Sequence, residues 1–545
     1  MLTKSESVTS VAPVSPPDEL NAAASRLIEA LSRVLAPDEI ISDSAARERL
    51  SSDVYSQGET ARLVIRPADR QRLADAVGLI TAQGFAVFPR GGGMSYTGGY
   101  LPDRRQAVVV DTSALDAILE VSPENMTITV EAGVTWKAIY ETLDPLGLRL
   151  PFFGTFSGAC ATVGGGLSNG ALFMGTARYG SGAELVLGLE VVTANGNVLT
   201  TGQAGFKNGK GFYRSYGPDL TGLFVHDAGA LGVKAAATLR LIKKPSANDY
   251  ASFVFATAAD AAAALSDIAR SGCAEEVYVF DPETNRRSMK EADLKADIKR
   301  LLNVVKKQGL RAGAGIAAAG RGVAGDDVYS LHLVCAGNTD EAVAADRATC
   351  CELALRHRGA EIADSIPRAV RANLFEPLNG ILGGDGDRWA ALNSKVAHED
   401  AAETIEGVNR IFASHADAMA ANRVTFSQLF VAISNHAFSY EPVLRWYDEW
   451  LPLHRSTPEP SHLKKLTEPE PNPKGRALVE TIRREIVAFF QARGAASTQI
   501  GRTYPYYDSL SPVAAELVAA LKQSLDPSGL MNPGALGLPA SKPID

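Results

Sequence analysis

Cysteine is scarce in this sequence. Five cysteines occur in 545 residues, at positions 160, 273, 335, 350 and 351, and no two of them form a CxxC pair. An odd number of scattered cysteines is not typical of a disulfide framework, and a zinc ribbon needs paired cysteines. This usage fits a reducing compartment, so we expect a cytoplasmic protein.

Basic residues and long apolar runs are lacking as well. The 54 lysines and arginines are outnumbered by 62 acidic residues, which gives a net charge of −8. We therefore expect no nucleic-acid partner. No stretch of about 18 apolar residues is free of charge, so no membrane span is expected. Residues 1–20 lack the apolar core of a signal peptide and are predicted to form a disordered tail.

The sequence does contain short β-branched runs that alternate with helical patterns through residues 21–245. Apolar residues recur at helical spacing over 70–83, and 85–88 is an apolar run typical of a buried strand. Asn195-Gly196 between two apolar runs predicts a hairpin. We predict an α+β fold with domains over residues 21–245 and 246–494. A C-terminal segment, residues 495–545, is expected to return to the first domain.

A glycine-rich segment, Pro89-Arg-Gly-Gly-Gly-Met-Ser-Tyr-Thr-Gly-Gly-Tyr100, directly follows the predicted strand. Glycine lets the backbone approach a ligand closely, and successive N–H groups can face a pyrophosphate. The segment is not a Walker A loop, because Gly99-Tyr100 replaces the lysine and hydroxyl residues. Tyr96 also stands where a Rossmann fingerprint needs its third glycine. A nucleotide other than NAD is therefore indicated, with a ligand-free surface loop as the alternative.

A second glycine cluster spans residues 154–170, and two backbone-exposing segments in one domain suit a long, flat ligand with a diphosphate. Four motifs in order then resemble the vanillyl-alcohol oxidase/p-cresol methylhydroxylase (PCMH-type) superfamily, nearest the branch of D-lactate dehydrogenases and the glycolate oxidase flavin subunit. They are Pro-Arg-Gly-Gly-Gly at 89–93, Ala-Thr-Val-Gly-Gly at 161–165, Asp-Leu-x-x-Leu-Phe with a Gly-x-Leu-Gly turn within 219–232, and the closing motif at 525–534. The similarity covers about residues 45–245 and 495–535.

The resemblance implies FAD, a two-subdomain PCMH-type FAD-binding domain and an α+β substrate-cap domain. It also implies which residues hold the cofactor. These are Arg90, Gly91, Gly92, Gly93, Met94, Ser95, Cys160, Ala161, Thr162, Gly164, Gly165, Ser168, Asn169, Gly232, Val233 and Asn532.

The mode of flavin attachment depends on two positions. Many members of this superfamily tether FAD through a histidine just after the glycine loop, and Met94 stands there and cannot form that bond. A few relatives use a cysteine in a Cys-x-Thr-Val-Gly segment, and Cys160 has that spacing. The alternative for Cys160 is an inert buried thiol. We predict non-covalent FAD, with a cysteinyl link at Cys160 as the second possibility.

Flavin-dependent dehydrogenation also needs a group that takes the substrate's hydroxyl proton. Arg502 can pair with a carboxylate or phenolate through two hydrogen bonds, and neighbouring tyrosines can bind a phenolate or relay a proton. The alternative is that this segment only packs the seam between domains. A helix over 443–450 would place Arg445 and Glu449 one turn apart as an ion pair. The catalytic candidates are Arg502, Tyr504, Tyr506, Tyr507 and His436, with His454 as a second candidate base.

No metal is expected. Metal-using members of the hydroxy-acid branch carry a Gly-His-x-Gly-Asp-Gly-x-x-His segment, whereas residues 331–338 here lack its Asp and second His. Residues 383–387 carry carboxylates without the spacing of an EF-hand.

The resulting hypothesis is hydride transfer from a CH–OH group of a small hydroxy acid or alcohol to flavin N5. Two alternatives are an oxidase or dehydrogenase of para-substituted phenols or aromatic alcohols, and a non-catalytic flavin-binding subunit of an electron-transfer complex. The electron acceptor is left open among oxygen, a quinone, a cytochrome and another flavoprotein. A homodimer is what the resemblance suggests.

Overall fold

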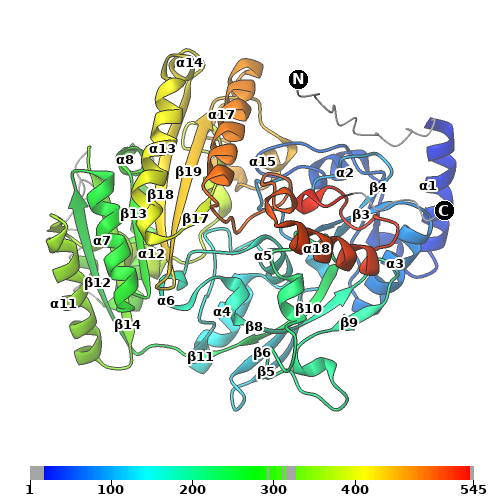
Figure 1. Ribbon diagram of the computed structural model, residues 1–545, viewed down its shortest axis with the longest axis horizontal. Coiled ribbons are helices and arrows are strands. Elements are labelled where there is room, and N and C mark those ends of the chain that lie inside the picture. Colours follow the sequence, from blue (N-terminus) through cyan, green and yellow to red (C-terminus); the bar gives the residue numbers. More distant parts are fainter. Residues whose placement is uncertain (1–16, 291–293, 310–311, 315–326, 540–545) are drawn as a thin grey trace.

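The computed structural model describes residues 17–290, 294–309, 312–314 and 327–539 (Figure 1). Helix α1 (Pro17–Leu31) begins inside the tail that we expected to be disordered to residue 20. Proline is favoured at the first helical position because its missing N–H has no partner there anyway, which explains the early start. The rest of the expected tail, residues 1–16, lies outside the described residues.

The first sheet has the strand order β1-β2-β4-β3. Its strands are β1 (Ile40–Ile41), β2 (Leu63–Ile65), β3 (Ala86–Arg90) and β4 (Ala107–Asp111), and β4 pairs in parallel with β2 and β3. Helix α3 (Arg70–Ala82) connects β2 to β3, and its buried face packs with α1 against the sheet. Strands β2 and β4 are buried along their whole length, as expected for a parallel sheet covered on both faces. The expected helix and strand between residues 70 and 90 are thus confirmed.

The second sheet is antiparallel, with the order β5-β6-β10-β8-β9. Its strands are β5 (Ile118–Ser122), β6 (Thr127–Glu131), β8 (Val186–Val192), β9 (Val198–Thr200) and β10 (Val233–Arg240). Strands β8 and β9 form the expected hairpin, and Gly196 in its turn has a φ of 78°. A small ladder of β7 (Leu148–Arg149) and β11 (Ile242–Lys243) lies beside it. Two helices near this sheet, α4 (Trp136–Leu143) and α5 (Val163–Asn169), position the second glycine cluster.

The third sheet has eight strands in the order β15-β12-β14-β13-β18-β19-β16, with β17 also paired to β19. Figure 1 shows it on the left, with the smaller sheets to the right. The strands are β12 (Ala247–Phe255), β13 (Glu276–Phe280), β14 (Tyr329–Gly337), β15 (Ala360–Ile362), β16 (Arg388–Ala391), β17 (Ser394–Val396), β18 (Val424–Ile433) and β19 (Ala437–Trp446). We refer to this sheet and its helices as the cap.

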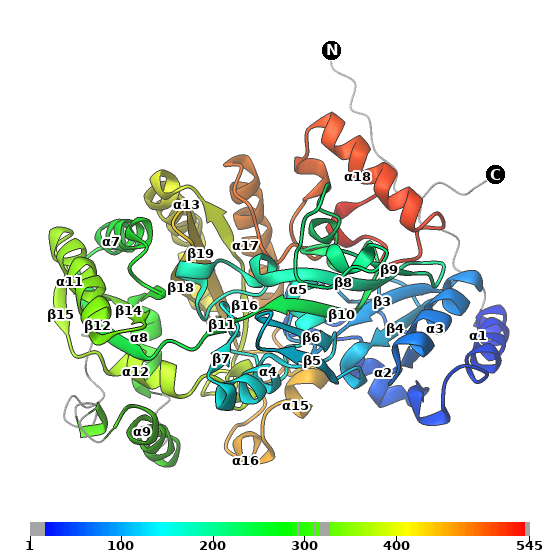
Figure 2. The same cartoon turned by 90° about the horizontal axis from the view of Figure 1, so that it is seen from below.

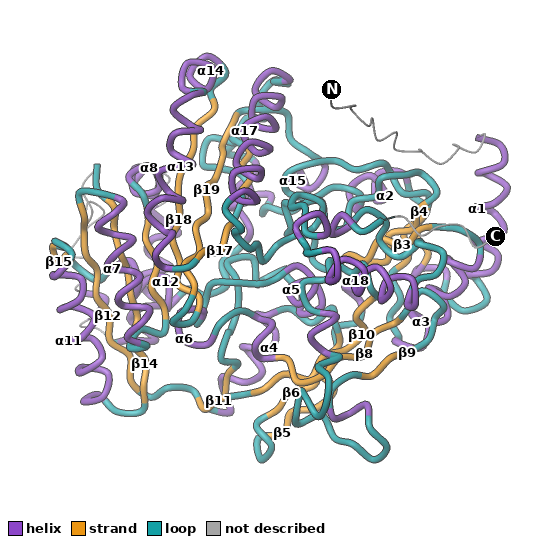
Figure 3. Tube along the Cα trace, in the orientation of Figure 1, coloured by secondary structure: helices purple, strands orange, loops and turns teal. Residues whose placement is uncertain are grey.

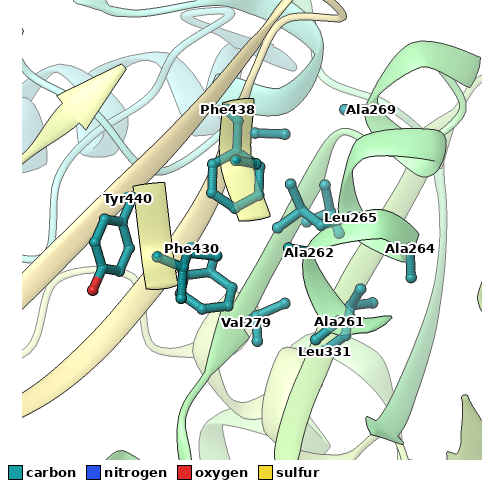
Figure 4. Close-up of a cluster of buried hydrophobic side chains, with 14 of the residues drawn as sticks. Ala261, Ala262, Ala264, Leu265, Ala269, Val279, Leu331, Phe430, Phe438 and Tyr440 are labelled. Carbon is teal, nitrogen blue, oxygen red and sulfur yellow. The ribbon is translucent and has the colours of Figure 1, made fainter. Parts of the chain in front are cut away.

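Four helices cover one face of the cap sheet: α7 (Ala258–Ser271), α11 (Asp340–Arg356), α13 (Ala401–Ser414) and α17 (Pro473–Ala492). Small alanines on α7 let it lie close to the strands, where Leu265 meets Val279 and Phe430 (Figure 4). The opposite face of the sheet turns toward the first two sheets. There Tyr278 and Val431 share a hydrophobic core with Phe173.

The remaining helices are short or peripheral. They are α2 (Ser44–Leu50), α6 (Thr176–Tyr179), α8 (Pro282–Lys290), α9 (Leu294–Gln308), α12 (Ser365–Ala372), α14 (Ala416–Ala421), α15 (Pro452–Ser456), α16 (Pro460–Leu463) and α18 (Pro512–Leu525). None of the helices in the described ranges is long and apolar enough to cross a bilayer.

The helix over residues 443–450 that would pair Arg445 with Glu449 does not form. Strand β19 runs to Trp446 and pairs with β18 over ten consecutive positions, with Arg445 opposite Thr425. The inner residues of β19 alternate in burial, which is the pattern of a strand. This alternation over a long ladder outweighs the four-residue spacing of Arg445 and Glu449, which alone suggested a helix. Glu449 is instead paired with Arg476.

The C-terminal segment lies along the first sheet. The N–H of Val87 in β3 donates to the carbonyl of Leu530 at 2.8 Å, and the N–H of Asn532 donates back to Val87 at 2.8 Å. Residues 530–532 therefore lie beside the edge strand that leads into the glycine loop. The architecture is α+β, as expected.

Candidate functional site

A cavity lies between the two glycine-rich segments. Nearly all the residues predicted to hold a cofactor line it; only Cys160 and Asn532 do not. The predicted residues that do so are Arg90, Gly91, Gly92, Gly93, Met94, Ser95, Ala161, Thr162, Gly164, Gly165, Ser168, Asn169, Gly232 and Val233. The structure thus brings together segments that are more than one hundred residues apart in the sequence.

The backbone of the glycine loop needs glycine for steric reasons. A Cβ atom on Gly92 would lie 1.9 Å from the carbonyl oxygen of Cys160, so the two loops touch through their backbones. Gly93 has a φ of 74°, which side-chain-bearing residues rarely adopt. Asn169 fixes the same contact from the other loop, since its amide donates to the Ser95 hydroxyl at 3.2 Å. The cavity wall is therefore formed by tightly packed main chain.

Three buried polar atoms of residues that line the cavity have no hydrogen-bond partner among the described residues. They are Nε of Arg90, Nε1 of Trp136 and Oε1 of Gln499. Leaving such groups without partners costs free energy, about 1–3 kcal/mol each. A polar ligand in the cavity would satisfy two donors and one acceptor. A long nucleotide such as FAD, with a charged diphosphate and a polar ring edge, fits this set and the glycine backbone.

Arg502 does not line the cavity. Its Nη1 donates to the carbonyl of Gly98 at 2.6 Å, and its Nη2 donates to Pro533 O at 2.6 Å and to Asn532 Oδ1 at 2.8 Å. Asn532 in turn donates to the carbonyl of Gly99 at 2.7 Å. Burial lowers the pKa of Arg502 to about 10. Both residues therefore clamp the glycine loop from outside the cavity.

The three candidate tyrosines separate into two environments. The Tyr504 hydroxyl is buried and accepts a hydrogen bond from the N–H of Asn393 at 2.6 Å, and burial raises its pKa to about 12. Tyr506 and Tyr507 instead pack against a small cluster around Ala535 and Leu536. Only Tyr504 faces the region between the cap and the glycine loop.

The candidate histidines lie away from the cavity wall. His436 is exposed in the turn between β18 and β19. His454 is fully buried: its Nδ1 accepts from the N–H of Leu451 and its Nε2 lies 3.1 Å from the carbonyl of Val54. Burial lowers the pKa of His454 to about 3, so it is a neutral structural residue. Neither histidine is brought to Arg502 or Tyr504.

A group that we did not predict lies on the cap strand β19, close to Tyr96 of the glycine loop. Glu441 lies on β19, on the strand face opposite the buried Tyr440 and Leu444, and its carboxyl interacts with the Tyr96 side chain. Tyr96 also interacts with Gln499, which lines the cavity. Burial raises the pKa of Glu441 to about 7, partly offset by Tyr96. The signal in the sequence was the one acidic residue of β19.

Cys160 is partly buried and does not line the cavity, although Ala161 and Thr162 beside it do. Burial raises the pKa of its thiol, against the attraction of Arg90. A protonated thiol is a poor nucleophile. This favours non-covalent FAD, which stays a prediction.

In the described ranges, no three His, Cys, Asp or Glu side chains gather as a metal site would require. The absence of a metal also stays a prediction. The acidic turn at residues 383–387 is held by Arg287, which donates to Asp387 at 2.6 Å.

Comparison with known families agrees with the cavity. Residues 61–202 match a family model described as an FAD binding domain, and residues 500–536 match the model of the FAD linked oxidases, C-terminal domain. These two segments carry the glycine loops and the Arg502 clamp.

Two curated relatives match the chain in part. It is 28% identical over 256 residues to D-lactate dehydrogenase (cytochrome) 1, mitochondrial, of Saccharomyces cerevisiae, a match that covers 45% of this chain and 42% of that protein. It is 29% identical over 241 residues to glycolate oxidase subunit GlcD of Bacillus subtilis, covering 44% of this chain and 50% of that protein. The chain thus spans about half the length of these relatives.

A solved structure of p-cresol methylhydroxylase with substrate bound shares the fold over nearly the whole length. Its TM-score is 0.72 at 18% identity, and the match covers 96% of this chain and 98% of that chain. The two family models identify the cofactor as FAD, and the cavity fits it. In the two segments that these models match, the chain is similar to FAD linked oxidases, and it has the fold of p-cresol methylhydroxylase.

Proposed function

We propose that this protein is an FAD-dependent oxidoreductase that oxidises a CH–OH group of a small hydroxy acid or alcohol. The observation that carries the proposal is the glycine-walled cavity, which fits FAD and is built from segments that match FAD-linked family models. Bound FAD would supply the two-electron acceptor, taking the hydride from carbon at N5. The substrate hydroxyl must then lose a proton, and we propose that Glu441, whose carboxyl has a pKa of about 7, accepts it.

The protein groups around Glu441 suit a base. A catalytic base works best when its pKa is close to the working pH, because enough of it is deprotonated while it still binds a proton well. Burial raises the pKa of Glu441 to about 7, and its interaction with Tyr96 partly offsets this rise. Gln499 links Tyr96 to the cavity wall. We propose Glu441 as the catalytic base and Tyr96 as a positioning residue.

A second candidate substrate class is a para-substituted phenol or aromatic alcohol. Two hydroxyls, of Tyr96 and Tyr504, interact electrostatically with Glu441. Trp389 packs edge-on against Tyr96, at 5.5 Å between ring centroids, and adds an aromatic wall. Phenolic hydroxyls and rings favour aromatic substrates. A non-catalytic flavin subunit is the remaining alternative.

The test is an anaerobic absorbance titration of the flavin-containing protein with 2-hydroxy acids, aromatic alcohols and para-alkylphenols. We expect one class to bleach the oxidised flavin, and the Glu441→Gln variant to be reduced about 10² to 10⁴ times more slowly with its flavin content unchanged. Glu449→Gln removes a carboxylate outside the site and is the matched control. If no class bleaches the flavin, the enzyme proposal is wrong. If a substrate bleaches the flavin but the Glu441→Gln variant is reduced at the wild-type rate, Glu441 is not the base.

We retain three further proposals. The domain boundaries are residues 21–245, 246–494 and 495–545, supported by the separate sheets. A cytoplasmic location is supported by the five free cysteines. A homodimer and an electron acceptor drawn from oxygen, a quinone, a cytochrome or a flavoprotein complete the proposal.

A further inference from the structure

The connection between β9 and β10 exposes an unusual number of large apolar side chains. We call residues 205–223 the aromatic loop. Tyr216 is 69% exposed and Phe212 is 58% exposed. The exposed large apolar side chains of this loop are Phe206, Phe212, Tyr213, Tyr216, Leu220 and Leu223. Contiguous exposed apolar residues commonly mark a surface that binds another molecule.

The aromatic loop is held in place by its own hydrogen bonds. Arg214 donates to the carbonyl of Ala183 at 2.7 Å and to the carboxylate of Asp219 at 2.9 Å. The N–H of Gln203 donates to the carbonyl of Tyr213 at 2.9 Å. The backbone is therefore ordered while the rings point outward. Such a preformed surface loses little conformational entropy on binding.

The exposed rings lie in two pairs. Phe206 and Tyr216 lie 5.4 Å apart between ring centroids, and Phe212 and Tyr213 lie 6.4 Å apart. These pairs form two small aromatic groups along the loop. Each presents an amphipathic tyrosine beside an apolar phenylalanine.

The aromatic loop is basic, although the whole chain carries a charge of −8. Lys207 and Lys210 are exposed, and within the described residues neither forms an ion pair. Asp219 is the only acidic residue of the loop, and its carboxylate is paired with Arg214. The loop therefore combines a local positive charge with exposed rings. The rest of the chain is acidic, so an anionic surface would be repelled elsewhere on the molecule.

We propose that the aromatic loop docks on the surface of an anionic phospholipid bilayer. Tyrosine and phenylalanine rings settle at the boundary between headgroups and acyl chains, and lysines are attracted to anionic headgroups. The loop projects beyond β8 and β9, away from the cap sheet (Figures 1 and 3). Figure 2 shows α7 and α11 of the cap at the opposite end of the molecule. A membrane bound at the aromatic loop therefore leaves these cap helices uncovered.

A projecting loop fits a deformable bilayer better than it fits a second folded copy, which would need a matching hollow. The experiment is co-sedimentation of the FAD-loaded full chain with vesicles of equal parts phosphatidylglycerol and phosphatidylcholine, and with vesicles of phosphatidylcholine alone. We expect binding to the anionic vesicles only, and weaker binding as salt is raised.

Two double variants test the two contributions of the loop. Phe212→Ser with Tyr216→Ser, and Lys207→Gln with Lys210→Gln, should each weaken vesicle binding about tenfold or more. Val513→Ser with Leu517→Ser on α18 removes two apolar residues that are 77% and 72% exposed, and should change nothing. Flavin absorbance and thermal unfolding report whether each variant is folded.

Several results would overturn the proposal. These are absence of binding to anionic vesicles, equal binding to phosphatidylcholine, unchanged binding by folded loop variants, or equal loss in the α18 control. Light scattering that shows a dimer dissociated by the loop variants, without vesicle binding, would assign the loop to a second copy of the chain instead.

Discussion

Arg502 and Asn532 are hydrogen-bonded to each other at 2.8 Å, and each also binds the backbone of the glycine loop. Arg502 reaches the carbonyl of Gly98 and Asn532 reaches that of Gly99, at 2.6 and 2.7 Å. Two residues thirty positions apart in the C-terminal segment thus hold a loop of the N-terminal region. The Arg502 side chain is committed to these bonds, so it is not available to bind a substrate carboxylate in this arrangement.

The Arg502→Leu variant should lose FAD affinity by about tenfold or more, because it removes the hydrogen bonds from Arg502 to Gly98, to Asn532 Oδ1 and to the carbonyl of the buried Pro533. The measurement is the FAD dissociation constant of the apoprotein, followed by flavin fluorescence. Arg502→Lys keeps the charge and one hydrogen bond, so its FAD affinity should lie between those of Arg502→Leu and the wild type. A normal FAD affinity combined with a raised KM would show that Arg502 binds substrate instead.

Glu441 should make flavin reduction depend on pH. Its carboxyl must be deprotonated to take a proton, so the rate of reduction should fall as pH drops through about 7. The Glu441→Gln variant should be slow and lack this inflection. The measurement is anaerobic stopped-flow reduction between pH 5 and 9. An inflection at the same pH in the variant would assign the titration to another group.

The same pKa predicts a stability effect of opposite sense. A carboxyl whose pKa is raised on folding binds more protons in the native state than in the unfolded chain, so it destabilises the protein as pH rises from about 4.5 to 7. The Glu441→Gln variant should therefore have a higher melting temperature than wild type at pH 8 and a similar one at pH 5. Equal melting temperatures at pH 8 would show that the carboxyl is not buried as described.

The fold and the cofactor loops were predictable from the sequence because their signals are local. The helix at residues 70–82, the β8–β9 hairpin and the glycine loop each depend on spacing or turn residues within a few positions. At Gly92 there is no room for a Cβ atom, so the loop requires glycine there and is recognisable in the sequence. The second glycine segment was recognisable for the same reason.

The active-site assignments were harder because they depend on contacts between distant segments. Nothing near Arg502 in the sequence indicates that Gly98 and Asn532 occupy its guanidinium. Glu441 becomes significant only when β19 places it beside Tyr96, far away in the chain. The tyrosines at 506 and 507 resemble site residues in composition but pack against the C-terminal cluster.

FAD should be released completely when the protein is precipitated with acid. Met94 stands at the cavity wall and cannot form a histidyl bond, and the pKa of the Cys160 thiol is raised by burial. The measurement is the absorbance of supernatant and pellet after precipitation. The Cys160→Ser variant should bind the same amount of flavin as wild type. Yellow colour in the wild-type pellet that is lost in this variant would establish a cysteinyl link.

The Arg371→Leu variant should destabilise the protein by about 3–5 kcal/mol, because it removes one member of a buried ion-pair network. Arg371 donates to Glu275 at 2.7 Å and lies 3.4 Å from Glu276 on β13, and Arg149 on β7 also binds Glu275. Burial alone would raise the pKa of Glu275, but the two arginines lower it, so its stabilising contribution is present above pH 4.5 and is lost on acidification. The measurement is the free energy of unfolding in urea at pH 7. The exposed Arg410→Leu variant is the control and should change this free energy by less than about 1 kcal/mol; an equally small change for Arg371→Leu would contradict the prediction.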